Sequence, residues 1–277
     1  MRERVHQFGT NRDLCGVTSE PAAGSDGSDL PALILLNSGI MHHVGPNRLQ
    51  VHLARILAED GYIAFRFDLS GIGDSESRKD SNAIEERSVN DICEAMDYLQ
   101  SIFGIDRFVL VGLCTGADNG HRAAVSDERV CGAILIDGYV YTTLKYLVIR
   151  LKSKIFRVSP WVNFPRRLFS LSKSKPETTN DIEGISFYWI PPPKHLVEQQ
   201  FKMLVARQVH LLQIFSGSYP PYSYKEQFHD AFRTVDFGSF LEVEYFEYAD
   251  HTFSLLRDRD SLTHLVIKWI NDRFKAP

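Results

Sequence analysis

The stretch Phe108–Gly116, FVLVGLCTG, decides the fold of this 277-residue chain. It starts with a short apolar run that is typical of a buried strand, and a helical pattern follows over 115–125. Gly112 and Gly116 flank Cys114 in a G-x-C-x-G pattern. A nucleophile in such a turn has a strained backbone, and larger side chains at the flanking positions would clash with the strand and the helix. The pattern therefore predicts a nucleophile elbow with Cys114 as the nucleophile, although a small Cys buried at a helix start is an alternative.

Outward from this stretch, short apolar runs alternate with helical patterns. We expect strands at 32–36, 62–67, 108–111, 130–136, 210–215 and 242–248, and helices at 47–60, 91–103, 115–125, 224–232 and 260–274. An antiparallel hairpin is expected over 5–18. This alternation predicts an α/β protein with a mostly parallel central sheet flanked by helices on both faces.

The alternation breaks after Asp137, where the chain becomes aromatic, irregular and rich in proline. The irregular part is roughly 70 residues long, which exceeds an ordinary connection. We therefore expect one α/β core, formed by residues 1–137 and 210–277, with a helical cap inserted at 138–209.

The charges are unevenly distributed between the core and the cap. The whole chain has 31 Lys+Arg against 35 Asp+Glu, a net charge of -4, which argues against a nucleic-acid partner. Residues 138–176 nevertheless contain no Asp or Glu and nine basic residues: Lys145, Arg150, Lys152, Lys154, Arg157, Arg166, Arg167, Lys173 and Lys175. Apolar residues at helical spacing predict a basic amphipathic helix over 144–156: Leu144, Leu147, Val148, Leu151 and Ile155.

This basic cap favours an anionic partner. We expect a small-molecule acyl substrate, carried as a thioester on coenzyme A or an acyl carrier protein, or else an acidic polysaccharide. A solvated charged face and attachment to an anionic membrane surface are the alternatives.

The four cysteines and the first residues of the chain bear on its compartment. Cys15, Cys93, Cys114 and Cys131 form no C-x-x-C pair, so we expect no metal site, no cofactor and a reducing, cytoplasmic location. Residues 1–10 have no apolar signal region, and no apolar run is long enough to span a bilayer.

A histidine, an oxyanion hole and three substrate contacts are also expected at the catalytic centre. His251 follows the last strand, and a nucleophile placed before the histidine in the chain is the order that goes with such an elbow. Backbone N–H groups of Ile40 and Thr115 are the expected oxyanion hole. We also expect the side chains or backbone of three residues to contact substrate: Ser38, Gly39 and Tyr219.

The chain resembles the α/β-hydrolase superfamily, in particular its serine-aminopeptidase-like branch. Residues Arg66–Ser75, RFDLSGIGDS, resemble that branch's D-x-x-G-x-G-x-S loop. Residues His43–Leu49, HVGPNRL, resemble hydrolases associated with exosortase and exopolysaccharide loci. The resemblance covers nearly the whole chain and implies an α/β-hydrolase fold with an inserted cap over the active site.

The sequence departs from this family at the third catalytic position. The family's acid usually follows the strand expected at 210–215, where register places Ser218 or Tyr219 instead. Asp137 follows the preceding strand, and we choose it as the acid. A Cys114–His251 dyad is the alternative, with Asp137 a turn residue, because a Cys nucleophile depends less on an acid than Ser does.

These residues predict acyl transfer through an acyl-Cys intermediate, with Cys114, His251 and Asp137 as the catalytic triad. A thioesterase or acyltransferase would act in this way on a thioester or ester, with water, an amine or a hydroxyl as acceptor. A non-catalytic binding protein with the same fold is one alternative. An esterase or peptidase in exopolysaccharide processing is another, and it rests on family analogy.

Overall fold

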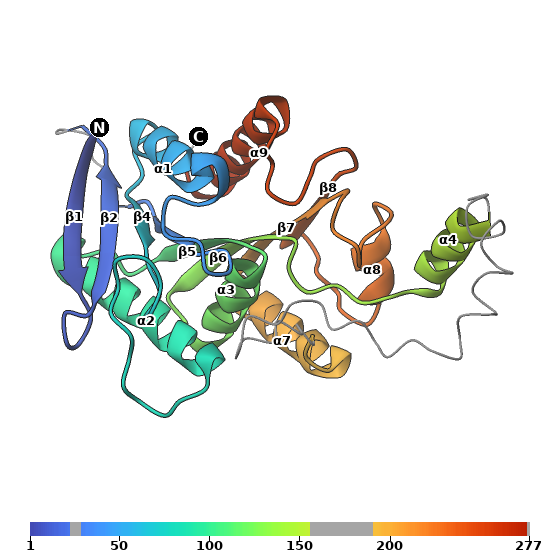
Figure 1. Ribbon diagram of the computed structural model, residues 1–277, viewed down its shortest axis with the longest axis horizontal. Coiled ribbons are helices and arrows are strands. Elements are labelled where there is room, and N and C mark those ends of the chain that lie inside the picture. Colours follow the sequence, from blue (N-terminus) through green and yellow to red (C-terminus); the bar gives the residue numbers. More distant parts are fainter. Residues whose placement is uncertain (23–28, 156–190, 276–277) are drawn as a thin grey trace, which may run out of the picture.

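The computed structural model describes residues 1–22, 29–155 and 191–275. An eight-stranded sheet in the order β1-β2-β4-β3-β5-β6-β7-β8 forms its centre (Figure 1). The strands are β1 (Arg2–Phe8), β2 (Leu14–Glu20), β3 (Ala32–Leu36), β4 (Ala64–Phe67), β5 (Phe108–Leu113), β6 (Val130–Ile136), β7 (His210–Ser216) and β8 (Leu241–Phe246). Strands β1, β2 and β4 pair antiparallel and all other neighbours pair parallel. The mostly parallel sheet and the N-terminal hairpin are confirmed.

Helices cover both faces of the sheet, as its alternating side chains require. The helices are α1 (Leu49–Glu59), α2 (Ile84–Phe103), α3 (Thr115–Ser126), α4 (Leu144–Ile155), α7 (Lys194–Ala206), α8 (Gln227–Ala231) and α9 (Leu256–Phe274), with a 3-10 turn η1 (Pro46–Arg48). On β3, Leu33 and Leu35 join the core beneath α1 and α9, whereas Ile34 points into the core beneath α2, α3 and α7. This architecture is the α/β-hydrolase fold.

Helix α7 differs from the sequence prediction. It lies inside the segment 138–209 that we expected to be cap, yet Val197, Phe201 and Leu204 are buried in the core against the sheet. It is the crossover helix between β6 and β7 and packs beside α3. Residues 194–206 thus pack on the core, and the division into a core and a cap at 138–209 stays a prediction.

Helix α4 forms where the apolar spacing predicted it, but it lies apart from the sheet (Figure 1). The structure describes no side chain of residues 152–190, so most of the basic cap residues lie outside the described part of the chain. No helix in the described part is long and apolar enough to cross a membrane.

Candidate active site

The turn between β5 and α3 has the geometry of a nucleophile elbow. Cys114 has φ 59° and ψ -122°, a conformation that residues other than glycine rarely adopt. A Cβ on Gly112 would lie 2.2 Å from the carbonyl carbon of Gly116. A Cβ on Gly116 would lie 2.4 Å from the backbone oxygen of Asn37. Both glycines of the G-x-C-x-G pattern are therefore required by close packing.

His251 lies in the loop after β8, and its ring bridges two of the predicted residues. Its Nδ1 is 2.7 Å from Oδ2 of Asp137, and its ring also makes a hydrogen bond with the side chain of Cys114. Asp137 is buried, whereas the His251 side chain is 35% exposed. The hydrogen bond to Asp137, and after it the one to Cys114, raises the pKa of His251 to about 10. Both contacts therefore favour the protonated form of the ring.

Asp137 is held in place by a residue that sequence reasoning missed. The backbone N–H of Ser216 donates to Oδ1 of Asp137 over 2.7 Å, and the Ser216 hydroxyl donates to Oδ2 over 2.6 Å. Asp137 has φ 52° and its N–H donates to the carbonyl of Ile214, so the turn after β6 directs the carboxylate toward the end of β7. Ser216 is the last residue of β7, and it donates to a carboxylate that follows the neighbouring strand β6.

The loop after β3 lies against the elbow, as the oxyanion-hole prediction requires. The N–H of Gly39 donates to the Thr115 hydroxyl over 2.7 Å, which ties this loop to the start of α3. Ile40 is 76% exposed. Within the part of the chain that the structure describes, the N–H groups of Ile40 and Thr115 donate to no protein acceptor. Ser38 lies in the same loop, between Asn37 and the bound Gly39.

A second His–Asp pair, which the sequence prediction did not include, fixes the loop after β3 by hydrogen bonds. The buried Asp68 accepts hydrogen bonds from the N–H of His43 at 2.6 Å and the side-chain amide of Asn37 at 3.0 Å. Its other oxygen is 2.7 Å from Nδ1 of His43 and 3.1 Å from the N–H of Asp74. Asn37 also reaches the carbonyl of Met41 and the N–H of Leu69. The Asp of the D-x-x-G-x-G-x-S loop therefore fixes the loop that carries Ile40.

His43, Asp68 and Asp74 also offer ligand atoms within 4.8 Å of one another, which invites comparison with a metal site. The Asp68 carboxylate, however, already accepts N–H donors on both oxygens. These donors stabilise the negative charge that an ion would otherwise neutralise. We therefore interpret the cluster as structural.

Tyr219 lies beside the catalytic candidates. Its ring stacks on His251 with centroids 6.0 Å apart and an interplanar angle of 12°. Its hydroxyl donates to the carbonyl of Gly138 over 3.1 Å. Burial, followed by the nearby Asp118, Asp137 and Cys114, raises the pKa of Tyr219 well above its usual range, so this side chain stays neutral. Tyr219 is thus placed to cover one side of the His251 ring.

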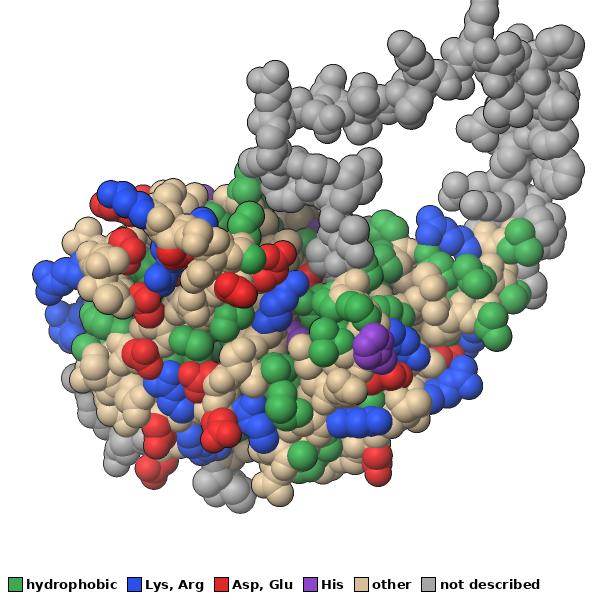
Figure 2. All heavy atoms as spheres, turned by 90° about the horizontal axis from the view of Figure 1, so that it is seen from below, with side chains coloured by type: hydrophobic (Ala, Val, Ile, Leu, Met, Phe, Trp, Pro, Cys, Tyr) green, Lys and Arg blue, Asp and Glu red, His purple; other side chains and the backbone are tan. Residues whose placement is uncertain are grey.

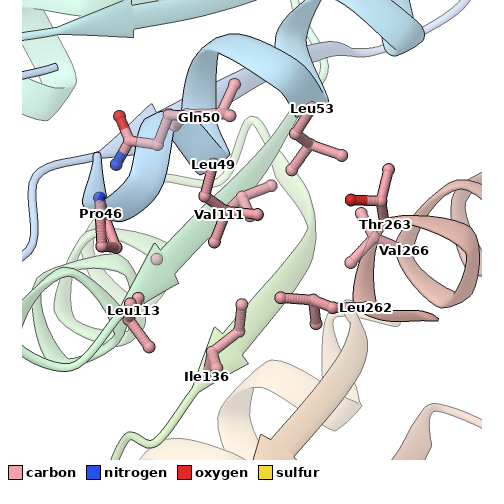
Figure 3. A pocket seen from close by; sticks show the side chains of 12 residues that line it. Pro46, Leu49, Gln50, Leu53, Val111, Leu113, Ile136, Leu262, Thr263 and Val266 are labelled. Atoms are coloured by element: carbon pink, nitrogen blue, oxygen red, sulfur yellow. The ribbon is translucent and has the colours of Figure 1, made fainter. Parts of the chain in front are cut away.

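A small apolar cavity lies under the elbow, between α1, α9 and the sheet (Figure 3). Leu49 and Leu53 from α1, Val111 from β5, and Leu262 from α9 point into it. Its volume is about 30 Å³, close to the space of one water molecule. This cavity is therefore too small to hold an acyl substrate.

The other three cysteines have different surroundings. Burial raises the pKa of Cys93 to about 11, and burial also raises the pKa of Cys15 and of Cys131. None of the four is in a disulfide. Cys114 is the one cysteine that touches His251 in the described part of the chain.

Comparison with known proteins agrees with the architecture. The family profile described as “alpha/beta hydrolase fold” matches residues 31–163. An esterase from Pyrococcus furiosus is similar over 99% of this chain and 91% of its own, with a TM-score of 0.61 and 15% identity. A serine hydrolase without lid from Xanthomonas campestris is similar over 100% of this chain and 97% of its own, with a TM-score of 0.57 and 16% identity. An alpha-beta serine hydrolase homologue from Coxiella burnetii covers 96% of each chain, also at a TM-score of 0.57 and 16% identity. No curated protein matches the sequence.

Proposed function

We propose that this chain, which has the α/β-hydrolase fold, belongs to the α/β-hydrolase superfamily and is an acyl-transfer enzyme whose nucleophile is Cys114. The observation that carries the proposal is the chain of contacts from buried Asp137 through His251 to a cysteine in a strained elbow. A structural cysteine needs neither the positive φ nor a histidine oriented by a carboxylate. The proposed substrate is a thioester or an ester.

The first half-reaction starts from the contact between Cys114 and His251. The Cys114 sulfur attacks the acyl carbon and forms a C–S bond, and His251 accepts the proton of the thiol. The carbonyl oxygen becomes an oxyanion that the N–H groups of Ile40 and Thr115 would bind. As the tetrahedral intermediate collapses, the bond to the leaving thiol or alcohol breaks, and the leaving group takes the proton from His251.

The second half-reaction regenerates the centre. His251 is now neutral and accepts a proton from the incoming water, amine or hydroxyl as that acceptor attacks the acyl-Cys carbon. The C–S bond to Cys114 breaks, the sulfur takes the proton back from His251, and the thiol forms again. Asp137 keeps the ring oriented throughout, and Ser216 keeps Asp137 oriented. Because an acyl-Cys is itself a thioester, transfer to an amine is as consistent with this centre as hydrolysis is.

The acyl carrier is inferred from charge. Residues 138–176 carry nine basic and no acidic side chains, so a phosphate-bearing carrier such as coenzyme A or an acyl carrier protein suits this segment. Ser38, Gly39 and Tyr219 border the proposed position of the acyl carbonyl.

The test is turnover of a panel of acyl-coenzyme A thioesters and aryl esters by the wild type, Cys114→Ala and Cys15→Ala. Cys15→Ala is the matched control because it removes a thiol that does not contact His251. We expect thiol or phenol release by the wild type and by Cys15→Ala, and none above background with Cys114→Ala.

Two results would contradict the proposal. Turnover that survives in Cys114→Ala would place the nucleophile elsewhere. A wild type that shows no turnover and no adduct with any acyl donor would favour a binding protein that has kept the fold.

A further inference from the structure

An ordinary surface helix buries its apolar side, whereas helix α4 packs on the protein by its polar side and leaves its apolar side exposed. Its buried residue is Tyr146, which is 4% exposed and whose hydroxyl donates to the carbonyl of Pro220 over 3.1 Å. Thr143, just before the helix, shares a hydrogen bond of 2.6 Å with the Tyr224 hydroxyl. The helix therefore attaches to the loop after β7 by its polar side.

In the part of the chain that the structure describes, no residue covers the apolar side of α4. We call it the α4 stripe, and its side chains are all more than half exposed: Leu144 82%, Leu147 54%, Val148 51% and Leu151 60%. These residues follow one another at spacings of three and four, so they form one continuous row. Figure 2 shows hydrophobic side chains next to Lys and Arg side chains at the end of the molecule where α4 lies. A row of exposed aliphatic residues of this kind marks an interaction surface.

Basic positions border the α4 stripe on both sides. Among the described side chains, Lys145 lies along one edge and Arg150 along the other. Arg150 contacts the Tyr146 hydroxyl, and Lys145 pairs with Glu226 at 3.2 Å in an exposed and therefore weak ion pair. No Asp or Glu occurs between 138 and 176.

We propose that the α4 stripe docks on an anionic membrane surface. An aliphatic row with cationic residues along both edges is the pattern of a helix that lies in the headgroup region. A second copy of this chain would bring the same positive charges against each other, which disfavours self-association through this face. An acidic protein would match the charge, but the bare aliphatic row without polar partners fits the lipid boundary better.

The test is co-sedimentation of the full chain with vesicles of phosphatidylcholine containing phosphatidylglycerol, against vesicles of phosphatidylcholine alone. The stripe variant is Leu144→Ser/Leu147→Ser/Leu151→Ser. The matched control is Ile84→Ser/Leu255→Ser/Leu256→Ser, because these three aliphatic residues are exposed to a similar degree elsewhere: 77%, 56% and 63%. Thermal unfolding of both variants checks that they fold, and we expect both to do so because the replaced side chains are exposed.

We expect the wild type and the control to bind the anionic vesicles, and the stripe variant to bind at least about tenfold more weakly. Binding should fall as NaCl rises from about 0.05 M to about 0.5 M, because salt screens the attraction to the lipid headgroups. Equal binding to the uncharged vesicles, equal binding by the stripe variant, or no binding by the wild type would each overturn the proposal. Two further results would overturn the proposal if vesicle binding is absent. One is a concentration-dependent dimer that the stripe variant does not form. The other is a complex with an apo acyl carrier protein that the stripe variant does not form.

Discussion

Two His–Asp pairs in this protein have the same geometry and different surroundings. In each, a histidine Nδ1 lies 2.7 Å from Oδ2 of a fully buried aspartate: His251 with Asp137, and His43 with Asp68. His251 also contacts Cys114 and keeps 35% of its side chain exposed, whereas His43 is 12% exposed and holds a loop. A buried His–Asp contact is therefore no sign of catalysis by itself. What distinguishes the pairs is that the more exposed ring, His251, reaches the proposed nucleophile Cys114.

The aspartates differ in the same way. Asp68 accepts four hydrogen bonds from three residues of two loops. Its carboxylate therefore fixes the backbone of these two loops. Asp137 accepts two bonds from Ser216 and contacts one catalytic candidate. We infer that one pair orients the ring that moves protons and the other supports the oxyanion loop.

The largest expected difference is in the turnover rate, between variants of the two histidines. His251→Gln removes the group that holds and returns the proton, so we expect the turnover rate to fall about 10²- to 10⁴-fold. His43→Gln keeps a donor for Asp68 and leaves Cys114 and His251 in place, so the rate should fall less than about tenfold. Steady-state rates of the two purified variants check this. An equal loss in both would break the distinction between the pairs.

Substitution of Asp137 should mainly lower the turnover rate, whereas substitution of Asp68 should mainly lower the stability of the fold. Asp137→Asn should lower the turnover rate about 10- to 10³-fold, because the ring loses its orientation, with a smaller effect than in a serine enzyme. Asp68→Asn should lower the free energy of unfolding by about 2 to 4 kcal/mol, because buried donors lose a charged acceptor. Urea unfolding and turnover of both variants give the comparison. If Asp68→Asn lost more activity than Asp137→Asn without losing stability, Asp68 would be the catalytic acid.

Ser216→Ala is expected to act only on the catalytic pair. It removes the hydroxyl bond to Asp137 and keeps the backbone one, so we expect a loss of turnover rate of about tenfold or less, with KM unchanged. A displaced pH–rate profile would show that Ser216 acts through the carboxylate, and Ser216→Thr should restore the profile. An unchanged profile with reduced stability would make Ser216 merely structural.

The smallest expected effect is on the pH dependence of stability. The pKa of His251 is raised to about 10 in the folded protein, so its stabilisation is complete below about pH 6.5 and is lost as pH rises toward 10. Burial acts to raise the pKa of Asp68, but hydrogen bonds from His43, Asp74 and Asn37 outweigh it and lower the pKa. Its contribution is thus present above its usual value of 3.8 and is lost as pH falls.

Unfolding of the wild type, His251→Gln and Asp68→Asn across this range measures both contributions. The difference between the wild type and His251→Gln should shrink toward alkaline pH. The difference between the wild type and Asp68→Asn should shrink toward acid pH. The reverse signs would contradict the assigned charges.

The sheet and the elbow could be predicted because their signals are local. Apolar runs mark the strands, and Gly112 and Gly116 mark the close contacts of the turn. Helix α7 was missed although Val197, Phe201 and Leu204 have helical spacing after Pro193, because the irregular residues before it dominated the interpretation of the segment. The helical spacing of these three apolar residues could therefore have predicted α7 from the sequence.

The supporting contacts of the site had no such signal. The bonds from Ser216 to Asp137 join residues 79 positions apart, and the His43–Asp68 pair joins two separate loops. The choice of Asp137 required only its place at the end of a strand. The role of Ser216 requires the register between β6 and β7 and the positive φ of Asp137, which only the tertiary structure supplies.

The most direct test of the account is the position of the acyl group during turnover. The wild type and His43→Gln are mixed with a slowly hydrolysed acyl thioester, quenched in acid, and analysed by intact mass and peptide mapping. The account predicts one acyl group per chain, located on Cys114 in both proteins, and none on His251→Gln at the same time point. An acyl group on Ser216, Ser38 or another cysteine, or turnover without any adduct on Cys114, would contradict it.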